Sequence, residues 1–292
     1  MTRVAVATMS AVMALAVAAP VHAQGNDKGN GRKSGPPSSS VLPGPTAVSP
    51  AAVGTVPFAW IDDASVLPPG GAALSISMVR WQGTDASEIE VPVVGAAMGL
   101  TDRVQLGASI PRVAGSGDPG GTVGGLGTTY ISAKIGVLTG GRSGVKLAVA
   151  PTLEILGSGT LPSLAPGESR MQFGLPVSAE IDRGATRLFA SAGFFSGGVW
   201  FAGGGLGLQA TPRVSVSAAF SRAWTTAPSG TMLGDRRELS GGVGFQVTPQ
   251  VSLFGSLSRT IATTDEDGAG TTVNGGVIVL LAPAAARKPR GR

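Results

Sequence analysis

The sequence predicts an all-β fold, a 12-stranded antiparallel transmembrane β-barrel with a disordered N-terminal arm. A turn phrase recurs in residues 100–106, 210–216 and 247–253, each time with Thr early in the turn and an alternating strand after it. Strand-like segments of about 10–13 residues follow one another, which is enough to cross a bilayer when tilted. Gly makes up 46 of 292 residues, and a curved barrel uses Gly at bends and close strand contacts.

The repeated phrase indicates that one structural unit is reused. Its Thr residues are Thr101, Thr211 and Thr248, spaced by 110 and 37 positions, and the first interval is about three times the second. A polar turn between two alternating runs is typical of a β-hairpin. Hairpins chained at an even spacing favour a sheet that closes on itself.

Residues 1–23 have the pattern of a secretory signal peptide. Arg3 precedes an apolar run over 4–19, and Pro20 is followed by a small-x-small cleavage site. The alternative is a transmembrane helix, but the run is shorter than the ~20 apolar residues that such a helix needs. We expect the mature chain to begin near Gln24.

Residues 24–70 form the predicted arm, which is rich in Pro, Gly and Ser up to residue 56. An apolar patch follows at 57–63 and ends before the break at 67–70. Two interpretations of this patch remain open. It folds against or into the mouth of the barrel, or it anchors the chain at the membrane interface.

The predicted barrel spans residues 71–282, and a basic tail follows at 283–292. Its twelve expected strands are 71–82, 87–99, 103–113, 126–138, 144–155, 170–182, 186–196, 199–210, 213–225, 236–247, 251–262 and 271–282.

The strands alternate between apolar residues and small or polar ones. The even positions of 214–221 are apolar, as are the odd positions of 171–181, so each strand has one apolar face. A soluble β-sandwich would show the same alternation. Strand length and the alternation of short turns with longer connections favour a membrane barrel. An even number of strands would then place both termini in the periplasm.

The aromatic residues lie near predicted strand ends, as expected for membrane-interface girdles. Trp81, Trp200 and Trp224 are assigned to the outer rim as interface aromatics. Three phenylalanines are assigned to the same outer rim: Phe194, Phe195 and Phe201. Three others are assigned to the periplasmic rim: Phe189, Phe245 and Phe254.

Composition excludes several kinds of site. The only His is His22, inside the predicted signal peptide, and Cys is absent. Ser-His and Cys-His nucleophiles and imidazole or thiolate metal sites are therefore excluded from the mature chain, and we expect no enzyme and no cofactor. Residues 34–286 carry 14 basic and 16 acidic side chains, so the basic tails alone do not predict nucleic-acid binding.

Charged residues on the small-residue face are candidates for the lumen lining. Lys134, Lys146, Glu154 and Glu180 share this face by parity. They form either a charged lining that selects solutes in a wet lumen, which we favour, or internal ion pairs in a filled barrel. Glu88 and Glu90 are further candidates. They could act as an acid–base pair, but a solvated rim is the stronger expectation.

Two other features carry weaker signals. The acidic loop at 265–268 could bind Ca²⁺, but it lacks spaced ligands, and a solvated tip is the stronger interpretation. The Gly runs at 120–121, 124–125 and 203–205 precede no predicted helix and lack a Lys-Ser/Thr partner, so they predict no phosphate site.

Residues 99–107 resemble a strand start of bacterial outer-membrane barrels described as transporters, including the phenol meta-pathway degradation type. The shared phrase is Gly-Leu-Thr-Asp-Arg, and the likeness covers roughly residues 58–282. It implies an outer-membrane barrel that takes up small compounds, hydrophobic ones among them, and it carries over no functional residue. Many such barrels end on an aromatic residue, whereas here the last strand ends in Leu281 and a basic tail follows.

The favoured function is passive passage of small solutes through the lumen, with lipid and solutes as the partners. The alternatives are a closed structural or surface-display barrel and a soluble secreted β-protein. The sequence does not indicate the solute, the oligomeric state or whether residues 57–70 plug the lumen.

Overall fold

The computed structural model describes residues 61–84, 87–116, 124–140, 144–159, 169–225, 235–264 and 269–281. The predicted signal peptide, most of the arm, the acidic loop at 265–268 and the basic tail lie outside these residues. No helix in the described ranges is long and apolar enough to cross a membrane.

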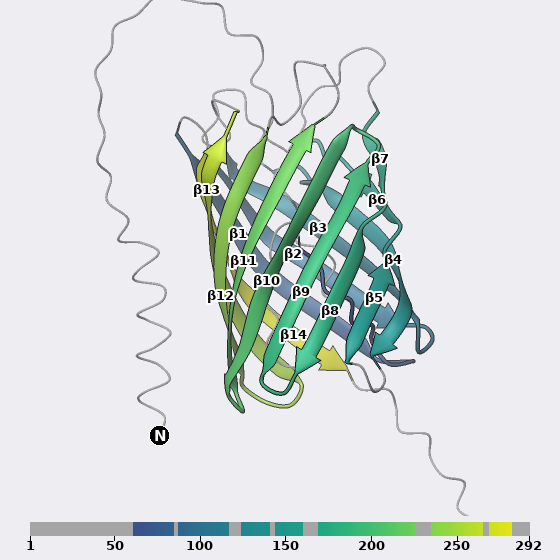
Figure 1. Ribbon diagram of the computed structural model, residues 1–292. Coiled ribbons are helices and arrows are strands. Elements are labelled where there is room, and N and C mark those ends of the chain that lie inside the picture. Colours follow the sequence, from purple (N-terminus) through teal and green to yellow (C-terminus); the bar gives the residue numbers. More distant parts are fainter. Residues whose placement is uncertain are drawn as a thin grey trace, which may run out of the picture. The chain divides into compact units, whose positions relative to one another are not determined.

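The described chain is a closed antiparallel β-barrel (Figure 1). Its strand segments are β1 (Ala72–Gly83), β2 (Ser87–Gly99), β3 (Val104–Ser116), β4 (Thr129–Gly140), β5 (Val145–Val149), β6 (Thr152–Ile155), β7 (Met171–Gly174), β8 (Val177–Arg183), β9 (Thr186–Phe195), β10 (Val199–Thr211), β11 (Val214–Thr225), β12 (Arg236–Gln246), β13 (Val251–Thr263) and β14 (Gly270–Leu281). The barrel closes where β1 pairs with β14, from Ala72 opposite Leu281 to Gly83 opposite Gly270.

The fourteen segments make twelve crossings, because two crossings are interrupted. β5 and β6 both pair with β4 and are separated at Pro151, while β7 and β8 both pair with β9 and are separated at Pro176. Proline has no backbone N–H to donate to a ladder. The two carbonyls still accept bonds, from Ala133 N to Pro151 O at 3.0 Å and from Ala150 N to Pro176 O at 2.8 Å. All twelve predicted strands are confirmed, with end shifts of a few residues.

The three repeated turns share one hydrogen-bond pattern. Thr101 Oγ1 accepts bonds from the N–H groups of Arg103 at 3.2 Å and Val104 at 3.0 Å. Thr211 and Thr248 accept the equivalent pairs at 3.3 and 3.0 Å and at 3.2 and 3.0 Å. A Thr hydroxyl bonded to the backbone two and three residues ahead closes the turn locally. The sequence repeat is therefore a repeated turn structure.

We expect Thr248→Ala to lower the free energy of unfolding by about 0.5–1 kcal/mol, because two turn N–H groups lose a common acceptor in a solvated place. Thr248→Ser keeps the hydroxyl and should retain most of the stability. Urea unfolding of the detergent-solubilised barrel measures both variants. Equal losses for the two would show that the hydroxyl does not support the turn.

The wall has an apolar outer face and a polar or small inner face. Large apolar side chains are exposed along the strands, for example Ile76 at 61% and Phe173 at 64%, while alternate positions such as Ser75 and Ser77 are buried. The short-turn rim carries the turns at 100–103, 184–185, 212–213 and 247–250. At the opposite, long-connection rim, β3, β6 and β11 end and β4, β7 and β12 begin. The β8–β9 turn marks the lower, short-turn end in Figure 1.

Candidate functional site: the barrel lumen

The segment that precedes β1 lies inside the barrel. Residues 61–67, which we name the strap, contact inward-facing side chains, and Ile61, Asp63, Ala64 and Leu67 are buried. The chain then turns at 68–71, where Gly70 N donates to Gly99 O at 2.8 Å and leads into β1. For its described part, 61–63, the predicted apolar patch therefore folds into the barrel.

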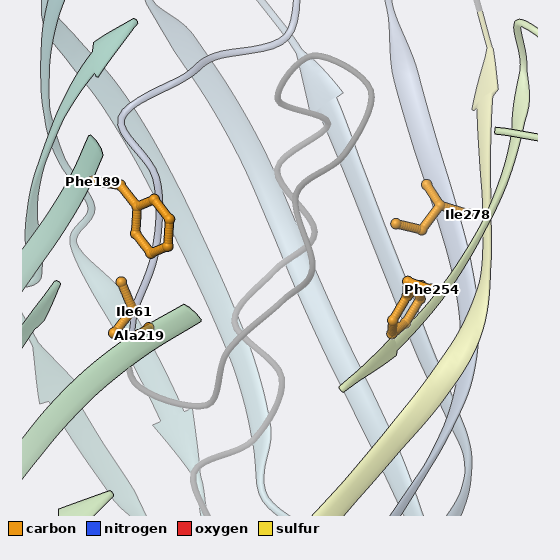
Figure 2. Close-up of a cluster of buried hydrophobic side chains, with 5 residues drawn as sticks. All are labelled: Ile61, Phe189, Ala219, Phe254 and Ile278. Carbon is orange, nitrogen blue, oxygen red and sulfur yellow. The ribbon is translucent and has the colours of Figure 1, made fainter. Parts of the chain in front are cut away.

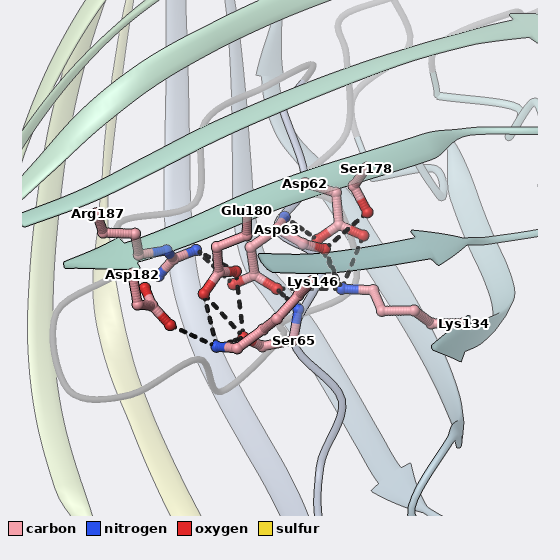
Figure 3. A network of polar contacts seen from close by, with 9 residues as sticks. All are labelled: Asp62, Asp63, Ser65, Lys134, Lys146, Ser178, Glu180, Asp182 and Arg187. Carbon is pink, nitrogen blue, oxygen red and sulfur yellow. Dashed lines mark hydrogen bonds and ion pairs between the residues drawn. The ribbon is translucent and has the colours of Figure 1, made fainter. Parts of the chain in front are cut away.

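Two adjacent aspartates of the strap bind Lys134 on the inner face of β4 (Figure 3). Lys134 Nζ lies 2.9 Å from Asp62 Oδ2 and 3.4 Å from Asp63 Oδ1, and it donates to Asp63 O at 3.0 Å. The Lys134 side chain is only 4% exposed. A buried ammonium group is tolerated because it has these partners.

Asp63 also reaches strands β8 and β9. Arg187 Nη2 lies 3.0 Å from Asp63 Oδ2, and Ser178 Oγ donates to Asp63 O at 2.9 Å. Asp63 therefore connects the strap to three strands of the wall, β4, β8 and β9. Arg187 lies over the Phe189 ring, 5.5 Å from its centroid, which fixes the guanidinium further.

A second group of contacts forms around Glu180 of β8. Ser65 Oγ donates to both Glu180 carboxylate oxygens at 3.1 Å, and Lys146 Nζ lies 2.8 Å from Glu180 Oε1. Arg187 approaches Glu180 Oε2 at 3.3 Å, and Lys146 also pairs with Asp182 at 2.7 Å. The strap is thus held by a continuous network and not by one isolated pair.

The two ends of the strap are fixed differently. At one end, the backbone N–H of Leu67 donates to Gln105 Oε1 at 2.9 Å. There the strap backbone approaches Gly99 so closely that a Cβ would clash with the Leu67 and Pro68 carbonyls. At the other end, Ile61 lies beside Phe189 and Ala219 in a buried cluster that also includes Phe254 and Ile278, which face them in Figure 2.

The network holds more acids than bases: Asp62, Asp63, Glu180 and Asp182 against Lys134, Lys146 and Arg187. Burial raises the pKa of Asp62 to about 6, although the Lys134 ammonium opposes the shift. Asp62 therefore remains mostly ionised at neutral pH.

The structure brings the four principal lumen candidates to the inner face but gives them partners. Lys134, Lys146 and Glu180 form ion pairs with or beside the strap, and Tyr130 Oη donates to Glu154 Oε1 at 2.9 Å. In this part of the lumen, the internal ion pairs that the sequence left as the less favoured alternative are present.

Glu88 and Glu90 also lie on the inner face, towards the long-connection rim. Glu90 is only 3% exposed, so the expectation of a solvated rim is wrong for this residue. Its carboxylate and Pro111 both occupy the space beside Gly127, in a stretch where the pairing of β2 with β3 is irregular. Within the described ranges, no group of three or more His, Cys, Asp or Glu side chains could hold a metal ion.

The interface aromatics divide between the two faces of the wall. Trp200 is 42% exposed and pairs in register with Trp224, so both lie on the outer face. Trp81 is 2% exposed and points inward, where its ring occupies the space beside Gly83 and Gly270. Its assignment as an interface aromatic is therefore wrong, because strand parity, not nearness to the rim, sets the direction of a side chain. The same parity buries four of the rings placed in the girdles: Phe189, Phe195, Phe201 and Phe254.

Several inner-face residues were not singled out from the sequence. Arg187 faces inward with Phe189 and Ser191, as its odd position in β9 would have shown. Arg236 and Glu238 form a buried pair on β12, 2.5 Å apart. Asp62 and Asp63 carried a usable signal, two charges at the end of an apolar patch, but no sequence pattern connects them with Lys134.

Strands β12–β14 line a different part of the lumen. Two neighbouring rows cross them, Ser240–Ser258–Thr272 and Gly242–Ser256–Asn274. We call these six residues the small-polar patch. All are partly exposed, whereas the inward positions of β1 from Ala73 to Trp81 are buried. The inner face therefore differs along the wall, with partly exposed small polar side chains on β12–β14 and buried side chains on β1.

The fold is that of outer-membrane β-barrels. The chain is similar to the COG4313 outer membrane channel from Pseudomonas putida F1, with 14% identity, a TM-score of 0.58, and coverage of 75% of this chain and 98% of that one. It is also similar to the NanC porin, with 7% identity, a TM-score of 0.50, and coverage of 72% and 100%. No protein-family model matches the sequence, and no curated protein matches it significantly. At these sequence identities the similarity establishes the fold alone, so the function has to be argued from the residues of the lumen.

Proposed function

We propose that the protein lets small solutes cross a bacterial outer membrane passively, through the part of the lumen lined by the small-polar patch. The observation that carries this proposal is the partial exposure of six small inward-facing residues on β12–β14. Small polar linings leave room for water and solute, and the bore and its charges then set selectivity.

The outer surface supports placement in a membrane. Exposed Leu, Ile, Val, Met and Phe side chains recur on the outer face of most strands, as expected for a lipid-facing wall. The short-turn rim, where β1 begins and β14 ends, would face the periplasm. The two similar structures are by name an outer membrane channel and a porin, which agrees with a passive role.

The chemistry of the patch favours small polar solutes. Ser, Thr and Asn side chains offer hydroxyl and amide groups to a passing solute, and the rows contain no large apolar side chain. The resemblance seen in the sequence also admits hydrophobic compounds, so solutes of both kinds belong in the test. That the chain is not an enzyme remains a prediction from its lack of His and Cys.

Ser258→Trp tests the proposal directly. Ser258 lies at the centre of one row of the patch, and an indole there would fill the space that solutes use. We expect single-channel conductance and the uptake of small sugars by liposomes to fall several-fold, with folding unchanged.

The matched control is Leu257→Trp, one residue away on the exposed outer face. It should leave conductance unchanged, because its ring faces lipid or detergent. Equal conductance for Ser258→Trp and the unmodified protein would remove the patch from the path. A folded barrel with no conductance at all would favour the second candidate, a closed structural barrel, for which the ion-paired strap is the supporting observation.

A further inference from the structure

Arginine residues recur at one level of the outer face, next to the apolar surface. In five strands an exposed large apolar side chain is followed, two residues closer to the long-connection rim, by an outward-facing Arg. The pairs are Met78 and Arg80 on β1, Ile110 and Arg112 on β3, Phe220 and Arg222 on β11, Leu239 and Arg237 on β12, and Leu257 and Arg259 on β13. We name the five basic residues the arginine belt.

The strand register makes most of the belt continuous. Arg222 of β11 lies directly opposite Arg237 of β12. Arg259 of β13 lies opposite Leu239, which is the next outward-facing residue of β12 after Arg237. Arg259 and Arg80 flank β14, opposite Thr271 and Val273 respectively. Four of the arginines therefore form an arc across five neighbouring strands, β11 to β14 and β1.

Among the described residues, the positive charge of the belt is only partly balanced. Asp235 binds two of its members: Arg222 at 2.8 and 3.0 Å, and Arg237 at 2.9 Å. These bonds lower the pKa of Asp235, so it stays ionised. One carboxylate thus serves two guanidinium groups, and in the described part of the chain no ion pair joins a carboxylate to Arg80, Arg112 or Arg259.

Aromatic rings lie at the same level. Arg222 lies over the Trp224 ring, 5.1 Å from its centroid. Trp224 pairs with Trp200, and the Phe194 and Trp200 ring centroids are 4.8 Å apart. Because Trp collects at the headgroup level of a bilayer, this cluster places Arg222 and Arg237 near lipid phosphates.

The charges at the short-turn rim differ from those of the arginine belt. Its described charges are mixed, with Asp102 beside Arg103, Asp182 near Arg183, and Arg213. The described lysines, Lys134 and Lys146, face the lumen. Over the described ranges, the outward positive charge at the long-connection rim is therefore carried by Arg, the side chain that binds phosphate with two parallel hydrogen bonds.

We propose that the arginine belt is a binding surface for a phosphorylated glycolipid of the outer leaflet, held by its phosphate groups while its acyl chains lie along the exposed apolar residues below. The occupant is a glycolipid of the outer leaflet because the belt lies only at the long-connection rim, which faces outward in this class of barrel. The inference rests on the proposed membrane placement and is independent of solute passage.

The test is lipid binding to the purified full chain in non-ionic detergent, read by native mass spectrometry. The probes are diphosphoryl lipid A, its dephosphorylated form and phosphatidylglycerol. We expect diphosphoryl lipid A to bind most tightly. The double variant Arg222→Gln with Arg237→Gln should weaken it about tenfold or more.

The matched control is Arg103→Gln with Arg213→Gln, which removes the same charge from the short-turn rim and should change binding less than twofold. Heat-modifiable gel mobility verifies that both double variants fold. Equal weakening by the two variants, equally tight binding of phosphatidylglycerol, or binding that ignores the phosphates would each overturn the proposal. Conductance of the same samples is read separately, so failure of the belt and failure of passage remain distinguishable.

Discussion

Asp63→Ala is expected to release the strap and raise single-channel conductance several-fold. The Asp63 carboxylate pairs with Lys134 and Arg187, and the residue is only 6% exposed. The substitution removes two ion pairs of the strap, while Lys134 keeps Asp62 and Arg187 keeps Glu180 as partners, so the expected cost is about 1–3 kcal/mol. Because this cost falls mainly on the docked strap, the barrel wall should stay folded while the lumen widens.

The absence of Cys from the chain permits a direct measurement of this release. An Ala64→Cys substitution introduces a single thiol at a strap position that is 3% exposed, so a water-soluble maleimide should label it slowly. Adding Asp63→Ala should accelerate labelling together with the rise in conductance. Asp102→Ala, in an exposed turn, is the control and should change neither. Unchanged labelling and conductance in the Asp63 variant would show that the ion pairs do not hold the strap.

The second large effect is expected from Gly276→Ala at the seam of the barrel. Gly276 lies on β14 opposite Ser77 of β1. A Cβ there would clash with the backbone oxygen of Ile76 and with Ser77. Because backbone atoms cannot move aside cheaply, we expect the free energy of unfolding to fall by about 1–3 kcal/mol, together with the yield of folded barrel.

Gly275→Ala is the matched control for this effect. The two residues are adjacent and undergo the same chemical change, but a Cβ at Gly275 would meet its nearest atom, Phe254 O, at an ordinary 3.5 Å. Urea unfolding and the heat-modifiable gel shift measure both variants. Equal stability of the two would mean that the seam tolerates the extra carbon, and close approach at Gly276 would not be needed for closure.

The barrel wall could be predicted from the sequence because strand alternation and turn formation depend on residues that are close in the chain. Alternation gives each strand two faces, and Thr101, Thr211 and Thr248 mark turns that close through their own hydroxyls. Two proline interruptions, at Pro151 and Pro176, split crossings without changing the count of twelve. Parity also identified Lys134, Lys146, Glu154 and Glu180 as inner-face residues.

Two side chains, Trp81 and Glu90, lie in other environments than the sequence pattern predicts. Trp81 was assigned by its distance from the rim, but its odd position in β1 turns it inward with Val79. For Glu90 the stronger expectation is a solvated rim, but its side chain packs beside Gly127 and Pro111 and is only 3% exposed. The error for Trp81 is therefore one of direction, whereas Glu90 points to the expected face and differs only in its burial.

The sequence by itself determined the closed antiparallel wall, its two faces, the repeated turns and the absence of His and Cys chemistry from the barrel. Only the tertiary structure decided what the lumen contains. Asp63 meets Arg187 across 124 positions of the chain, and Ser65 meets Glu180 across 115. Such contacts depend on how the barrel closes around the strap. Strand periodicity indicates which face of each strand points inward. It holds no information about a segment outside the strands, such as the strap, that folds into the barrel.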